Sequence, residues 1–121
     1  MNEPSQNEID KLKSQFSDRA LAQVEATSDG DSYAFIVTGP NKPEYDKFLH
    51  DIQAASALKS DEDKSRALRL AVEKAALAQI RWPDRAEVVA LFEKYPAMSL
   101  SFAEELHKLA GASFEVRSKK L

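Results

Sequence analysis

The sequence predicts an α+β domain in which an N-terminal helix and a β-hairpin precede a bundle of about four helices. Three observations support this prediction. The segment Tyr33 to Thr38 is rich in aromatic and β-branched residues, which favours a strand. Asp29-Gly30, just before it, supplies the positive φ that tight hairpins need. The second half of the chain repeats helix-cap patterns followed by apolar residues at helical spacing.

The first part of the chain predicts one short helix and then the hairpin. Residues 1–7 are polar, and we expect them to be disordered. Apolar residues at helical spacing predict a helix from Glu8 to about Asp18. Leu21 to Thr27 admits two interpretations, a continuation of that helix or a strand. The turn at Ser28 to Asp31 favours the strand, paired with Ser32 to Thr38.

Four further helices are predicted, each opened by a cap residue with an acid three positions later. These pairs are Asn41 with Glu44, Ser60 with Asp63, Asp84 with Glu87, and Ser101 with Glu104. The helices are expected over 41–58, 61–81, 84–95 and 101–110, with Pro83, Pro96 and Gly111 after the last three. The helix over 61–81 carries a wide face of small apolar residues, so it is the expected central helix.

The C-terminal end of the chain divides into an apolar part and a basic part. Phe114 and Val116 are expected to fold back on the core. Residues 117–121 form a basic C-terminal tail. The sequence therefore predicts one α+β domain over residues 8–116.

Composition limits the classes of protein to consider. The chain has 121 residues, of which 43% are hydrophobic and 31% charged, which indicates one soluble domain. Its apolar runs are too short for a membrane span, and its start lacks a signal peptide, so we expect a cytoplasmic protein. The net charge of −3 disfavours nucleic-acid binding, as do Glu104 and Glu105 at the start of a candidate recognition helix.

No pattern in the sequence indicates catalysis, and we expect a protein that is not an enzyme. There is no cysteine and no G-x-S-x-G motif. The two histidines, His50 and His107, are far apart and are expected to be exposed, so we predict no metal site and no cofactor. Residues 38–42 lack the spacing of a phosphate-binding loop, and the acids at 61–63 suit the start of a helix.

Large apolar side chains gather at helix ends and in a loop of the second half. Such residues are either part of the core, which is the commoner outcome, or a surface for a partner. A groove of this kind accepts a partner helix through apolar residues at i, i+3 and i+4. The candidate partner-binding residues are Trp82, Tyr95, Met98, Leu100 and Phe102.

Two stretches of the chain resemble phage tail assembly chaperones. The first is Tyr33 to Phe48, which is similar to the strand, the "P-x-K/R-x-E" motif and the helix start of that family. The second is Val88 to Pro96 with Leu100, Ala103 to Leu106 and Leu109 to Gly111, similar to an "L-x-x-x-Y-P … A-x-E-L/I … L-A-G" ending. The resemblance covers roughly Tyr33 to Gly111.

This resemblance implies a protein that keeps the apolar-rich tape measure protein soluble in the bacterial host cytoplasm and is absent from the mature virion. It names the tail tube protein and a frameshift-extended form, beginning near Lys119-Lys120, as further partners, and it allows a homo-oligomer. The alternative hypothesis is a small acidic phage regulator or inhibitor that binds a host protein. Neither hypothesis involves nucleic acid or a membrane.

Overall fold

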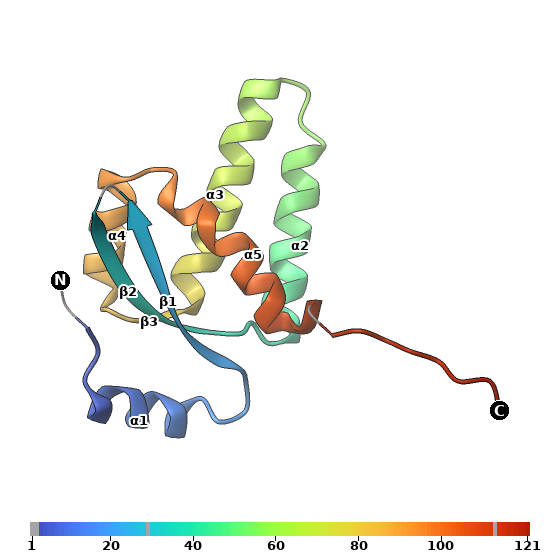
Figure 1. Cartoon of the computed structure of the whole chain (residues 1–121). Helices are drawn as coiled ribbons and strands as arrows, with labels where there is room; N and C mark the ends of the chain where they lie inside the picture. The colour runs from blue at the N-terminus through green and yellow to red at the C-terminus, as the bar shows by residue number, and fades with distance from the viewer. Residues whose placement is uncertain (1–2, 29, 113) are drawn as a thin grey trace.

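The computed structural model describes residues 3–28, 30–112 and 114–121 and confirms the predicted α+β fold (Figure 1). An N-terminal helix and a hairpin come first, and helices with one short strand follow. The elements in chain order are α1 (Gln6–Gln15), β1 (Leu21–Ser28), β2 (Asp31–Thr38), α2 (Lys42–Ser56), α3 (Asp61–Gln79), β3 (Ile80–Trp82), α4 (Arg85–Lys94), the 3-10 turn η1 (Met98–Ser101), α5 (Phe102–His107) and the π-helical turn η2 (Lys108–Ala112).

The hairpin has the predicted register. Leu21 lies opposite Thr38 and Thr27 lies opposite Ser32. Gly30 has a φ of 83°, as a tight turn requires, whereas Asp29 lies outside the described residues. The alternation of strand residues therefore decides which side chains of β1 and β2 meet the helices.

The helix predicted over 61–81 is too long, because Ile80–Trp82 forms a third strand instead. Trp82 lies opposite Ile36 and Ile80 opposite Val37, in an antiparallel pairing with β2. Within the described residues the strand order is β1-β2-β3, so β2 is central. Ile80 continues the helical spacing of the residues before it, and only pairing with β2 makes this segment a strand.

Three of the four predicted helix caps are confirmed. The side chains of Asn41, Ser60 and Asp84 accept hydrogen bonds from the backbone N–H groups three residues later. The cap predicted at Ser101 is wrong, because η1 runs directly into α5 and the described residues show no side-chain cap there. Gly111 follows α5 with a φ of 105°, which a helix C-terminus favours.

The core lies between one face of the sheet and the helices α3, α4 and α5. Phe35 and Val37 of β2 are fully buried there, and the rings of Phe35 and Phe102 meet edge to face with centroids 5.1 Å apart. The other buried members of this cluster are Ala76, Ile80, Val88, Phe92 and Leu106. A side chain is excluded at Gly39, since a Cβ there would lie 2.7 Å from the carbonyl oxygen of Leu109.

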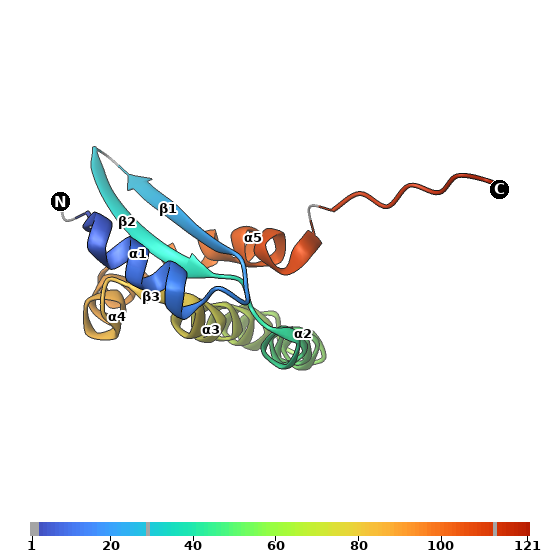
Figure 2. The same cartoon turned by 90° about the horizontal axis from the view of Figure 1, so that it is seen from below.

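Helix α1 lies below the sheet in Figure 1 and in front of it in Figure 2, and it contacts the sheet through β3. Trp82 Nε1 donates to Glu8 Oε2 at 2.7 Å, and the Arg81 guanidinium lies 4.3 Å from the centroid of the Phe16 ring. None of the ten residues of α1, all of which the structure describes, is buried. The helix begins at Gln6, two residues before the predicted start at Glu8, while residues 1–2 lie outside the described part.

The C-terminal segment does not return to the core. Phe114 and Val116 are 84% and 96% exposed, so the prediction that they fold back is wrong. The segment runs away from the body in both views (Figures 1 and 2). Among the described residues, no helix has the length and apolar character needed to cross a membrane.

Candidate functional site

A groove of about 810 Å³ lies between the β-hairpin and the segment that joins α4 to α5. We call it the hairpin groove. The apolar part of its lining consists of Val24, Ala26, Tyr33, Tyr95, Pro96, Ala97, Met98 and Phe102. Its charged lining residues are Glu25, Asp31, Lys94 and Glu105, so acids outnumber bases there. The groove thus combines an apolar surface with a negatively charged surround.

The hairpin supplies one wall of the groove through the alternation of its residues. Val24 and Ala26 are separated by two positions, so both lie on the face of β1 that packs toward the core cluster. Ala26 lies opposite Tyr33 of β2, which adds an aromatic ring to the same wall. The small Ala26 side chain leaves the space that a larger residue at this position would fill.

The helical side supplies the other wall through the end of α4 and the start of α5. Tyr95 is the C-cap of α4, and Met98 opens η1. Phe102 is only 3% exposed and packs against Phe35 and Phe92, so it belongs to the core as well as to the lining. Met98 has a flexible thioether side chain, which adapts to the shape of a bound group.

Two tyrosines close one side of the groove. The Tyr33 and Tyr95 rings have centroids 6.1 Å apart, and their hydroxyl oxygens are 3.5 Å apart. The hydrogen bond to Tyr95, with a smaller contribution from desolvation, raises the pKa of Tyr33 above its ordinary value. Tyr33 therefore stays neutral at physiological pH, and the hydroxyl groups of both tyrosines can serve as donors or acceptors.

A second hollow, of about 830 Å³, lies beside the hairpin groove and contains Trp82. Asp31, Tyr33 and Lys94 line both hollows, so they separate the two. Leu91, Pro83, Ala34 and Ala90 add to the apolar lining around Trp82. The indole N–H of Trp82 is used in its hydrogen bond to Glu8.

The five residues predicted to bind a partner therefore separate in the structure. Tyr95, Met98 and Phe102 meet in the hairpin groove, Trp82 lies in the second hollow, and Leu100 is 46% exposed outside the lining of both. The prediction missed the strand side of the groove, which is supplied by Val24, Ala26 and Tyr33. The period-two alternation of the hairpin could have placed these three on one face, but not opposite Tyr95, Met98 and Phe102.

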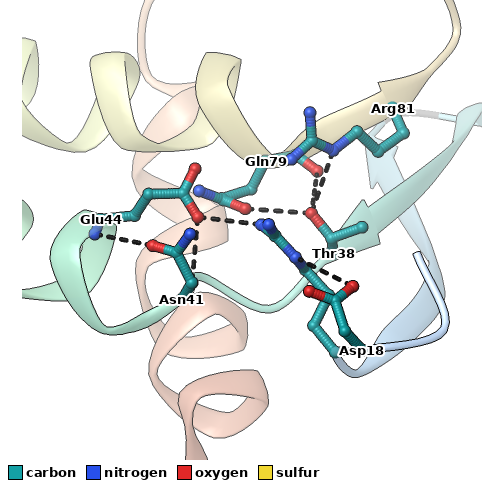
Figure 3. Close-up of polar contacts among 7 residues, drawn as sticks. Asp18, Thr38, Asn41, Glu44, Gln79 and Arg81 are labelled. Carbon is teal, nitrogen blue, oxygen red and sulfur yellow. Dashed lines mark hydrogen bonds and ion pairs between the residues drawn. The ribbon is translucent and has the colours of Figure 1, made fainter. Parts of the chain in front are cut away.

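A polar cluster joins the ends of β2 and α3 to the start of α2 (Figure 3). Thr38 Oγ1 donates to Gln79 Oε1 at 3.0 Å and accepts from Arg81 Nε at 3.1 Å. Arg19 Nη1 donates to Glu44 Oε1 at 2.9 Å, and the same oxygen accepts from the Asn41 backbone N–H at 2.9 Å.

Burial and neighbouring charges set the pKa values in this cluster. Partial burial raises the pKa of the Glu44 carboxyl, but hydrogen bonds from Asn41 and Gln79 and the charge of Arg19 outweigh it and hold that pKa below its ordinary value. Burial and the charge of Arg19 lower the pKa of Arg81. The Thr38 hydroxyl is fully buried, so a solute cannot reach it without opening the fold. We therefore assign the cluster a structural role.

The two histidines occupy different environments. His50 is exposed, as expected, but His107 is only half-exposed and its Nδ1 lies 2.9 Å from the Tyr45 hydroxyl. Its ring also packs against Phe48, so the expectation of an exposed His107 is wrong. Across the described ranges, no three His, Cys, Asp or Glu side chains lie close enough to hold a metal ion.

Comparisons with known proteins give the family and support the fold. The profile of the family described as "Domain of unknown function (DUF6848)" matches residues 10–119, and the chain belongs to this family. A search of curated proteins finds no match. A solved structure described as the uncharacterised protein rbstp2171 from Bacillus stearothermophilus aligns with 92% of this chain and 99% of its own, at 18% identity and a TM-score of 0.63. At this identity the likeness supports the fold alone.

Proposed function

We propose that the protein is a non-enzymatic assembly chaperone that binds the phage tape measure protein and keeps it soluble during tail assembly. The hairpin groove is the observation that carries this proposal. It offers aromatic rings, a flexible methionine and small apolar residues in one continuous lining. Residues 33–111 resemble phage tail assembly chaperones. This resemblance implies that the protein acts in the bacterial host cytoplasm and is absent from the mature virion.

The chemistry of the groove favours an apolar helical segment as its occupant. A helix presents side chains at i, i+3 and i+4 along one face, and such a stripe fits an elongated apolar groove. Glu25, Asp31 and Glu105 favour basic residues beside that stripe. Covering the stripe removes from water the surface through which tape measure chains aggregate. The tail tube protein then displaces the chaperone as the tail is built.

The test is to co-express the tape measure protein of the same phage with the tagged chain and to measure how much soluble complex is recovered. Met98→Asp places a charge against the apolar stripe and should lower recovery by about tenfold or more. Leu100→Asp is the matched control, since it adds the same charge to an exposed position two residues away, outside the groove. Phe102 is unsuitable for this test because it is a buried core residue. Met98 is only partly buried but also packs against the core cluster, so circular dichroism must show that Met98→Asp keeps its fold.

Two results would contradict the proposal. One is a tape measure protein that remains insoluble when the chain is present in excess. The other is equal recovery with Met98→Asp and Leu100→Asp, which would move the binding surface away from the groove. Recovery of a host protein in place of the tape measure protein would favour the alternative hypothesis of a regulator or inhibitor.

A further inference from the structure

We propose that the hairpin groove also binds the C-terminal segment of a second copy of this chain. In this complex residues 114–117 of one copy add as a strand to the free edge of β1 in the other. Phe114 and Val116 then enter the hairpin groove. Three features of the structure lead to this inference: the pattern of the C-terminal segment, the direction of the backbone groups of β1, and the charges of the two surfaces.

The C-terminal segment has the pattern of a strand, but it pairs with no strand in the part of the chain that the structure describes. Phe114-Glu115-Val116-Arg117 alternates apolar and charged residues, which is the period of a half-buried strand. Both apolar side chains are almost fully exposed. An alternating apolar segment held in water loses the stabilisation that burial of one face would provide.

β1 offers an unpaired edge beside the groove. Among the described residues it pairs only with β2. The N–H of Gly39 donates to the carbonyl of Ala20 at 2.8 Å, which identifies these two as a hydrogen-bonded pair. Because such pairs alternate along an antiparallel ladder, the backbone groups of Gln23, Glu25 and Thr27 point away from β2.

The free edge and the groove form one surface. Val24 and Ala26 face the groove, and Glu25 and Thr27, whose side chains lie on the other face of β1, line it as well. The hollow therefore extends to the edge of β1. A strand added at this edge places its alternate side chains beside Val24 and Ala26. Phe114 and Val116 have the required spacing of two residues. Edges of this kind bind extended peptides through backbone hydrogen bonds, with pockets selecting alternate side chains.

Charge favours the same pairing. The C-terminal segment carries three bases, Arg117, Lys119 and Lys120, and one acid, Glu115. The groove lining carries Glu25, Asp31 and Glu105 against the single base Lys94. Opposite charges on the two surfaces steer their encounter. The apolar pairs set the register of the added strand, in which Glu115 lies opposite Glu25 at some cost.

The geometry favours a second copy over the chain's own segment. The groove involves the start of α5, at Ser101 and Phe102, whereas the C-terminal segment leaves from the other end, after η2. The positive φ of Gly111 ends the helical turn, and the segment then runs away from the body (Figure 1). Two copies related by a two-fold axis can exchange these segments reciprocally and fill both grooves.

Self-association protects the groove until a client arrives. The regulatory part of this inference rests on the proposed client binding, since the client would displace the segment. The association itself does not rest on it. Its test uses no client, so the two proposals can fail independently.

Sedimentation equilibrium of the full-length chain tests the association. We expect a dimer, and we expect Phe114→Ser combined with Val116→Ser to raise its dissociation constant by at least about tenfold, because two apolar side chains no longer enter the groove. Leu58→Ser combined with Leu70→Ser is the matched control, which removes two exposed apolar side chains elsewhere and should leave the constant unchanged. A monomer at all concentrations would overturn the inference, as would a dimer that the double variant leaves intact.

Site-specific crosslinking identifies the segment and its origin. The chain has no cysteine, so an introduced cysteine is the only thiol of the copy that carries it. Copies carrying Glu115→Cys are mixed with differently tagged copies carrying Thr27→Cys and treated with a short bismaleimide. A crosslink between the two tags is the expected result. When both substitutions are placed in one chain, a predominantly intrachain crosslink would show that the chain binds its own segment and would overturn the inference.

Discussion

Helices α1 and α5 contrast in length, capping and burial. α1 has ten residues and a complete capping box, in which Ser5 and Glu8 exchange side-chain and backbone hydrogen bonds. α5 has six residues and no side-chain cap among the described contacts, yet its Phe102 and Leu106 are 3% and 1% exposed. Capping helps a helix to start, whereas burial decides how much the helix contributes to the stability of the fold.

Burial explains the difference. A cap satisfies backbone groups within the first turn and contributes about 1 kcal/mol. A buried phenylalanine removes a large apolar surface from water and fills space among its neighbours, and deleting it costs about 3–5 kcal/mol. We therefore expect α5 to unfold only with the whole domain and α1 to open separately. Four substitutions test this expectation, from the largest effect to the smallest.

Phe102→Ala should lower the free energy of unfolding by about 3–5 kcal/mol, because the cavity lies beside Phe35 and Phe92. Urea denaturation followed by circular dichroism measures this change. Leu100→Ala is the control and should change stability by less than about 0.5 kcal/mol, since Leu100 is exposed. Equal effects of the two substitutions would show that α5 is not part of the core.

Glu44→Gln should lower the free energy of unfolding by about 1 kcal/mol at pH 7, because it weakens the charged hydrogen bonds that fix α2 to the chain after α1. The pKa of Glu44 is lower in the folded chain than its ordinary value of 4.5. Its contribution is therefore present above pH 4.5 and is lost as the pH falls through the folded-state value.

Denaturation curves at several pH values check this prediction. The difference between the original chain and Glu44→Gln should shrink as the solution is acidified below pH 4.5. Glu62→Gln, at an exposed surface pair with Arg66, should show little difference at any pH. A loss of stability in Glu44→Gln that does not depend on pH would indicate that Glu44 stabilises the fold by packing and not by its charge.

Phe16→Ala should destabilise the contact of α1 with the sheet by about 1 kcal/mol, since it removes the ring next to the Arg81 guanidinium. Hydrogen exchange should show faster exchange across α1 and unchanged protection in α3. Gln15→Ala, at an exposed neighbouring position, provides the control. Faster exchange throughout the domain would show that α1 and the core unfold as one unit.

Ser5→Ala should have the smallest effect, a loss of about 0.5–1 kcal/mol confined to the first turn of α1. Chemical shifts of the α1 backbone report its helix population directly. The thermal midpoint of the domain should not change, because the helix opens without the core. A clear drop in that midpoint would contradict the separation of α1 from α5.

The sequence predicted best those features that depend on local chemistry. The hairpin register follows from Asp29-Gly30, and the cap at Asn41 follows from its own side chain and Glu44 three residues later. The same local logic failed at Ser101, where η1 continues into α5 and leaves no separate helix start. The pattern was present, but the preceding backbone had already become helical.

Features that depend on distant partners could not be predicted in this way. Ile80 fits the spacing of α3, and only the edge of β2 makes it a strand. The helical side of the groove, at Tyr95, Met98 and Phe102, was predicted because large apolar residues at helix ends and in a loop indicate either core or a binding surface. Its strand side requires knowing that the hairpin packs against η1 and α5, and no local pattern contains that information.

Gly39 holds the base of the hairpin close to η2, outside the lining of the hairpin groove. Its backbone approaches the carbonyl of Leu109 so closely that a methyl group has no room, so η2, the turn after α5, packs directly on the base of the hairpin. Close packing at this contact therefore limits how far the hairpin can move relative to η2. A group of different thickness in the hairpin groove must be accommodated by rotation of side chains such as Met98, because the hairpin and η2 do not slide past each other.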